Sequence, residues 1–104
     1  MMRQRFACRR NSDVIAFRWQ DIDCRVQFSK LPGYQIGELF LDGAKLGSSA
    51  QILMHDSAVC ASLLLQHGCN LDDLRHSLLK LADGRSASPL GLALDLVAES
   101  ARAK

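Results

Sequence analysis

The segment from Gly37 to Gly68 constrains the fold more than any other part of the chain. It begins as a strand and continues, after a glycine-containing turn, into an apolar helix that Ser48 or Ser49 can cap and Gly68 can close. On a helical wheel the apolar side chains fall into two stripes. The broad stripe is Ile52, Leu53, Val59, Cys60, Leu63 and Leu64, and the narrow stripe is Met54, Ala58, Ala61 and Leu65. A helix that is apolar on two sides is expected to be buried on both sides, against the sheet and against more helices or a second copy of the chain.

Three strands are predicted around the start of this segment. Residues 13–20 and 22–29 alternate apolar and polar side chains with the period of two that is typical of half-buried strands. Residues 35–42 form the third strand, after a type II turn with Pro32 and Gly33 at its central positions. Because the connections are short, we predict an antiparallel meander with one apolar face.

Two further helices are predicted after Gly68. Asn70 can cap the first, and Ser88 followed by Pro89 can open the second. The helix that follows Asn70 has a stripe of leucines, which are Leu71, Leu74, Leu78, Leu79 and Leu81. The sequence therefore predicts one α+β domain at residues 13–99, a three-stranded antiparallel meander packed against two to three C-terminal helices. A flexible basic tail at residues 1–12 precedes it, and a frayed C-terminus follows at residues 100–104.

Length and composition exclude several classes of protein. The 104 residues suffice for one domain with a modest core, and no apolar run is long enough to cross a bilayer. No secretion signal is recognisable, so we expect a cytoplasmic protein without a membrane partner. The four cysteines lack a C-x-x-C pair and the three histidines lack metal-site spacing, so no metal or cofactor is predicted. Cys24 and Cys60 fall on apolar faces, where we expect both to be buried.

The N-terminal tail carries four arginines and no acid. They are Arg3, Arg5, Arg9 and Arg10. Such a tail can contact nucleic acid or an acidic partner, although many charged termini are merely solvated. A nucleic-acid-binding protein is therefore one alternative function, though not the favoured one.

Two charges interrupt the apolar stripes of the predicted helices. Asp56 lies within the broad stripe of the first helix, and Arg75 lies between leucines of the second. A buried unpaired charge is costly, so we expect these two residues to form a salt bridge, within the subunit or across a dimer. Glu38 is placed on the outer face of the sheet beside Ile36 and Phe40. A small ligand-binding protein or enzyme centred on Asp56 and Glu38 is the other alternative, but no catalytic residue is assigned.

Three short motifs occur in order along the chain: GELFL at residues 37–41, KLGS at residues 45–48 and SLLLQHG at residues 62–68. Together they resemble the TSCPD domain family, over about residues 13–98. The family includes a small domain near the C-terminus of adenosylcobalamin-dependent ribonucleotide reductases and short stand-alone bacterial proteins. The resemblance implies an accessory domain, because the reductase active site lies in a separate large barrel that this chain cannot contain.

The chain departs from the motif after which the family is named. In place of Thr-Ser-Cys-Pro-Asp it has SASPL at residues 86–90, with Ser88 where the cysteine would stand and Leu90 where the aspartate would stand. A thiol or zinc role is therefore not implied here. We expect a non-catalytic accessory or interaction module that is homodimeric and has a ribonucleotide-reductase-like or other protein partner.

Overall fold

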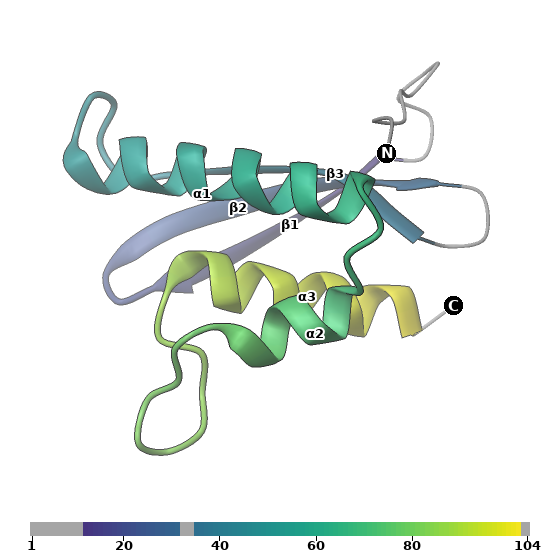
Figure 1. The fold of residues 1–104 in the computed structure, drawn as a ribbon. Coiled ribbons are helices and arrows are strands. Elements are labelled where there is room, and N and C mark those ends of the chain that lie inside the picture. Colours follow the sequence, from purple (N-terminus) through teal and green to yellow (C-terminus); the bar gives the residue numbers. More distant parts are fainter. Residues whose placement is uncertain (1–11, 32–34, 103–104) are drawn as a thin grey trace.

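The computed structural model describes residues 12–31 and 35–102. The elements follow in the order β1 (Ser12–Trp19), β2 (Ile22–Leu31), β3 (Gln35–Gly43), α1 (Ser49–Gln66), α2 (Leu71–Ser77) and α3 (Pro89–Arg102). The strands form one antiparallel sheet in the order β1-β2-β3, and the helices lie on one side of it (Figure 1). The predicted α+β architecture is therefore confirmed. The predicted turn at Pro32 and Gly33 and the arginine tail lie outside the described residues.

The sheet has an inner apolar face and an outer face of mixed character. Period-two alternation sends Val26 and Phe28 of β2, and Leu39 and Leu41 of β3, toward the helices, where all four are buried. The antiparallel register places Phe17 of β1 beside this core. The outer face carries the intervening residues, most of them polar, together with exposed Val14 and Phe40.

A β-bulge changes the pattern at the start of β3. The pairing shifts between Ser29, which faces Glu38, and Lys30, which faces Ile36, so Gly37 is an extra residue on β3. Beyond the bulge, Ile36 is turned inward and only 5% exposed. The expectation that Ile36 shares the outer face with Glu38 and Phe40 is therefore wrong, because the bulge interrupts the alternation.

Helix α1 runs along β3 and begins and ends as predicted. The Ser48 hydroxyl accepts a hydrogen bond from the Gln51 backbone N–H at 3.2 Å. At the other end Gly68 has a φ of 98°, and the Cys69 N–H bonds the carbonyl of Leu64 at 2.9 Å. The narrow stripe faces the sheet, and all its members are buried: Met54, Ala58, Ala61 and Leu65.

Helices α2 and α3 cover the rest of the inner face. Asn70 caps α2, and Ser88 caps α3 by accepting a bond from the Gly91 N–H at 3.0 Å. Helix α3 packs on β1 and β2, and α2 packs on α3.

Helix α2 is shorter than the leucine pattern suggested, so Leu79 and Leu81 lie in the following loop and are exposed. Helix α3 continues to Arg102, past the predicted domain end at residue 99. None of these helices is long and apolar enough to cross a membrane.

Candidate functional site

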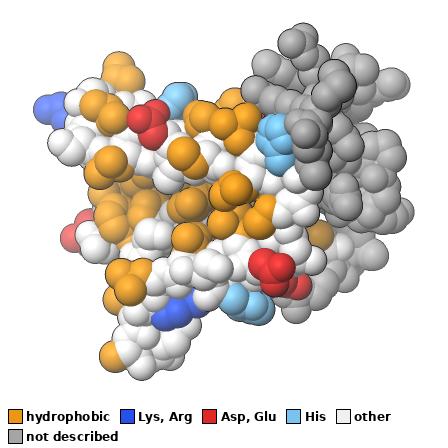
Figure 2. Space-filling view, in the orientation of Figure 1, with side chains coloured by type: hydrophobic (Ala, Val, Ile, Leu, Met, Phe, Trp, Pro, Cys, Tyr) orange, Lys and Arg blue, Asp and Glu red, His pale blue; other side chains and the backbone are white. Residues whose placement is uncertain are grey.

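The side of α1 that faces away from the sheet is apolar and uncovered. We call it the outer face of α1, and it consists of Ile52, Leu53, Asp56, Val59, Cys60, Leu63, Leu64 and His67. Its five large aliphatic residues range from 37% exposed at Leu63 to 68% exposed at Leu53. Figure 2 shows hydrophobic side chains gathered over α1 and over the surface between α1 and the other two helices.

This arrangement corrects two expectations. The broad stripe of α1, which we expected to be buried, is the exposed one, and Cys60 within it is exposed as well. The physical reason lies in how the helices are distributed over the sheet. Helix α3 packs on β1 and β2 and also contacts α1, and α2 packs on α3, but among the described residues the broad stripe of α1 stays exposed.

Ser62 fixes which side of α1 faces outward. Its hydroxyl accepts a hydrogen bond from the Leu39 N–H at 2.9 Å and donates one to the Leu39 carbonyl at 2.8 Å. Because β3 is an edge strand of the sheet, no described strand pairs with these two backbone groups, and the Ser62 hydroxyl serves as their hydrogen-bond partner. Ser62 is only 6% exposed, and Gln66, one helical turn further on, is only 4% exposed.

Asp56 lies on the outer face of α1 and not against another helix of its own chain. Its side chain is 74% exposed, and its carboxylate is 3.2 Å from Nδ1 of the neighbouring His55. Arg75 points instead toward α3 and is paired there. The expected bridge between Asp56 and Arg75 is therefore not formed within the subunit, because Asp56 is exposed on the outer face of α1 whereas Arg75 is directed onto α3. A bridge across a dimer stays a prediction.

Arg75 belongs to a polar cluster that ties α2, α3 and the loop between them. Its Nε donates to Oδ1 of Asp95 at 2.9 Å and its Nη1 donates to Asp72 at 2.8 Å. The other oxygen of Asp95 accepts a hydrogen bond from the Ser86 hydroxyl at 2.6 Å. Lys80 Nζ donates to Ser86 Oγ at 3.2 Å and to the Arg75 carbonyl at 3.0 Å.

The charge of Asp95 is stabilised by this cluster. Partial burial by itself would raise the pKa of the Asp95 carboxyl, but the hydrogen bonds from Ser86 and Arg75 and the charges of Arg75 and Lys80 lower it further than burial raises it. The pKa of Asp95 therefore lies below its ordinary value of 3.8.

The same cluster superficially resembles a serine nucleophile beside a lysine. Two observations favour a structural role. Ser86 is only 4% exposed, and its hydroxyl proton is directed to the Asp95 carboxylate. The cluster therefore holds the loop on α3. Sequence reasoning missed Asp95 and Ser86, although the position of Arg75 in a leucine stripe indicated that a neighbouring helix must supply an acid.

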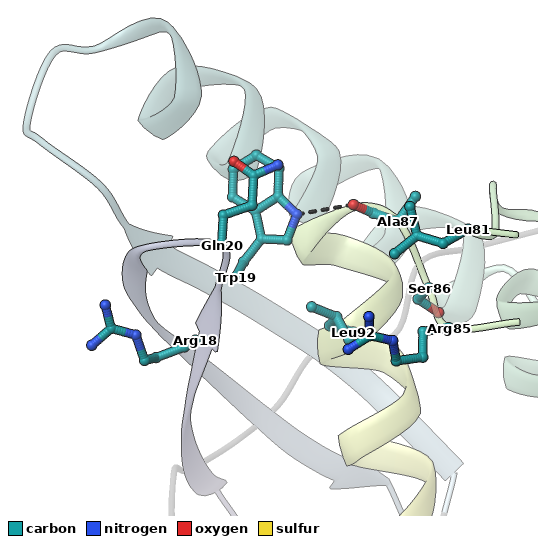
Figure 3. Close-up of a pocket in the computed structure, with 8 residues that line it drawn as sticks. All are labelled: Arg18, Trp19, Gln20, Leu81, Arg85, Ser86, Ala87 and Leu92. Atoms are coloured by element: carbon teal, nitrogen blue, oxygen red, sulfur yellow. Dashed lines mark hydrogen bonds between the residues drawn. The ribbon is translucent and has the colours of Figure 1, made fainter. Parts of the chain in front are cut away.

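A surface pocket of about 420 Å³ lies between the β1–β2 turn and the loop that precedes α3 (Figure 3). Trp19 lines it and donates a hydrogen bond from Nε1 to the carbonyl of Ala87 at 2.9 Å. The guanidinium of Arg18 points away from this indole and bonds Asp23 instead, and Arg85 is paired with Asp83. The charged groups at the pocket are thus already paired, which favours packing of the loop over ligand binding.

The remaining predicted residues do not form a joint site. Glu38 is half-buried on the outer face of the sheet, whereas Asp56 lies on the other side of the fold, on the outer face of α1. Arg3, Arg5, Arg9 and Arg10 lie outside the described residues. Among residues 12–31 and 35–102, no three potential ligands from histidine, cysteine, aspartate and glutamate gather to hold a metal ion.

Comparisons with known proteins found no matching family model, no matching curated protein and no matching solved structure.

Proposed function

We propose that this chain is a non-catalytic interaction module that binds other protein surfaces through the outer face of α1. In this role it is similar to the accessory TSCPD domain of adenosylcobalamin-dependent ribonucleotide reductases. The observation that supports the proposal is the apolar surface on a helix whose opposite side already packs on the sheet.

The exposed apolar residues lie together on one side of α1. They recur along nearly the whole length of α1. Single exposed hydrophobic residues scattered over a surface are common, whereas a row of them on one side of a helix is typical of a binding surface. The five large aliphatic residues together expose the equivalent of about two and a half whole residues. At about 1.5–3 kcal/mol for each fully buried side chain, covering this surface would contribute roughly 4–7 kcal/mol. The isolated domain leaves these side chains in water, so this free energy becomes available only when a partner covers them.

The chemistry of the face indicates what kind of partner it fits. Asp56 is the single acidic residue of this face. His67 lies on the face, and His55 lies beside it. Such a face suits an apolar protein surface better than nucleic acid, whose recognition needs a cluster of cations. We propose a second copy of the chain and a ribonucleotide-reductase-like protein as partners.

Site-specific photo-crosslinking in cells of the source organism tests the proposal. A photoreactive residue replaces Leu64 on the outer face of α1, and a control chain carries it at Asp73, which is exposed on α2. We expect crosslinks from position 64 to defined protein partners, identified by mass spectrometry, and far fewer from position 73. Equal crosslinking at the two positions, or none at position 64, would overturn the proposed function.

A further inference from the structure

We propose that the outer face of α1 binds a second copy of the chain, with the two α1 helices antiparallel and Asp56 of each copy facing His67 of the other. This inference rests on the proposed function and adds the partner and the way the partner binds. It is argued from the spacing and the charge of the exposed residues.

The exposed residues follow the spacing of a helix–helix seam. Asp56, Cys60, Leu63 and His67 are separated by four, three and four residues, which keeps them on one line along the helix. All four are exposed, and the apolar residues Val59 and Leu64 flank the line. A second helix can therefore lie along this seam with its axis nearly parallel to α1.

The seam is also complementary to itself when it is reversed. Its residues are arranged symmetrically about a point midway between positions 61 and 62. A two-fold axis at that point places Cys60 opposite Leu63 of the second copy, and it brings Val59 and Leu64 of the two copies to the same height on opposite flanks of the seam. It also places Asp56 and His67 at the same height, about 8 Å from the axis at a rise of 1.5 Å per residue. Apolar side chains then face apolar ones, and the acid faces an imidazole.

Charge decides against the main alternative register. An axis at position 58, near the middle of α1, would give a longer helix overlap. It would also bring the two Asp56 carboxylates within about 6 Å of each other along the helix axis. Like charges so placed in an apolar interface are unfavourable. His55, which is next to each acid, projects from the edge of the face and therefore does not lie between the two carboxylates. The register centred between positions 61 and 62 keeps the acids about 16 Å apart along the axis and gives each its own histidine.

Charge exchange between the two positions tests this arrangement. The variants Asp56→Lys and His67→Glu are purified separately, and native mass spectrometry measures the dimeric fraction of each and of their mixture. His67→Glu alone places two acids opposite each other, and Asp56→Lys alone replaces the acid that faces His67 with a cation, so we expect each variant to form at least a tenfold weaker dimer than wild type. The mixture pairs lysine with glutamate and aspartate with histidine, so we expect a heterodimer of the two chains.

Two controls keep the test decisive. The double variant Asp56→Lys/His67→Glu should dimerise with itself, and the exposed α2 pair Asp73→Lys and His76→Glu should leave the dimer unchanged. Circular dichroism checks that each chain is folded. Undiminished dimers of both single variants, a mixture without heterodimer, or a monomeric wild type would overturn the inference. If wild type dimerises and photo-crosslinks at position 64, but the charge variants dimerise as wild type does, the proposed function would stand and this register would be refuted.

Discussion

The hydroxyl of Ser62 bonds both backbone groups of Leu39, accepting from its N–H at 2.9 Å and donating to its carbonyl at 2.8 Å. One side chain of α1 thereby blocks the middle of the free edge of β3, which would otherwise be open to pairing with another strand. The same contact fixes the rotation of α1 about its axis. Its narrow apolar stripe is held on the sheet, and its broad stripe is left as an exposed surface.

Ser62→Ala should destabilise the fold, because it leaves a buried N–H and a buried carbonyl without their partner. We expect a loss of about 1–3 kcal/mol in the free energy of unfolding, measured by urea denaturation. Ser57→Ala is the matched control on the same helix. Its hydroxyl bonds only the Met54 carbonyl, which α1 itself already engages, so the loss should stay below about 0.5 kcal/mol. Equal losses for the two variants would contradict the role given to Ser62.

Asp95→Asn should weaken the fold at neutral pH and change its response to acid. Asparagine cannot provide the charge that accepts bonds from Arg75 and Ser86, so we expect a loss of about 1–2 kcal/mol. Because the folded pKa of Asp95 is depressed, its contribution is fully present above the ordinary value of 3.8 and is lost as the pH falls through the folded pKa.

The difference in unfolding free energy between wild type and Asp95→Asn should therefore shrink in acid. Urea denaturation of both chains from pH 6 down to the lowest pH at which they fold measures it. Asp83→Asn is the control, because Asp83 is paired with Arg85 on the surface. It should lower stability less than Asp95→Asn does at neutral pH. A constant difference down to pH 2 would show that the ionised Asp95 carboxylate is not what stabilises the cluster.

Gly91→Ala should destabilise the protein, although alanine is the better helix former by about 1 kcal/mol. A Cβ at this position would lie 2.9 Å from Cβ of Ser86, which is anchored by its bond to Asp95. We expect a lower melting temperature for Gly91→Ala in the wild-type background. In a Ser86→Gly background the clash disappears, and the same substitution should then raise the melting temperature. A stabilising effect in both backgrounds would argue against tight packing of the loop on α3.

The two sides of α1 should respond differently to truncation. Leu65 is 7% exposed and packs in the core, so Leu65→Ala should cost about 2–4 kcal/mol. Leu53 is 68% exposed, and Leu53→Ala should change the stability of the dilute monomer by less than about 0.5 kcal/mol. Denaturation at a concentration low enough to dissociate dimers compares the two. Similar losses would mean that the helix is rotated differently from the structure.

The elements of the fold could be predicted from local sequence because each has a local cause. Alternation gave the strands, and Ser48, Gly68, Asn70 and Ser88 marked helix ends by side-chain and backbone chemistry that acts within a few residues. The bulge at Gly37 could not be predicted this way. It depends on the pairing of β3 with β2, and it reverses the face of Ile36.

The candidate surface was only half predictable. The helical wheel showed two apolar stripes on α1, but hydrophobicity alone could not say which stripe meets the sheet. The narrow one does, because small residues such as Ala58 and Ala61 permit close packing and Ser62 is in place for Leu39. The partner of Arg75 was missed because Asp95 lies twenty residues further on, and only the packing of α2 on α3 brings the two together.

The claim that the outer face of α1 joins two copies of the chain is tested most directly by sedimentation velocity over a wide range of protein concentration. Wild type is compared with Leu53→Lys/Leu64→Lys, which places two charges on the face without touching the core. We predict that wild type shifts from the mass of one chain to that of two as concentration rises, whereas the variant stays at one chain with an undiminished melting temperature. A wild type that remains a single chain throughout, or a variant that dimerises as wild type does, would contradict the account.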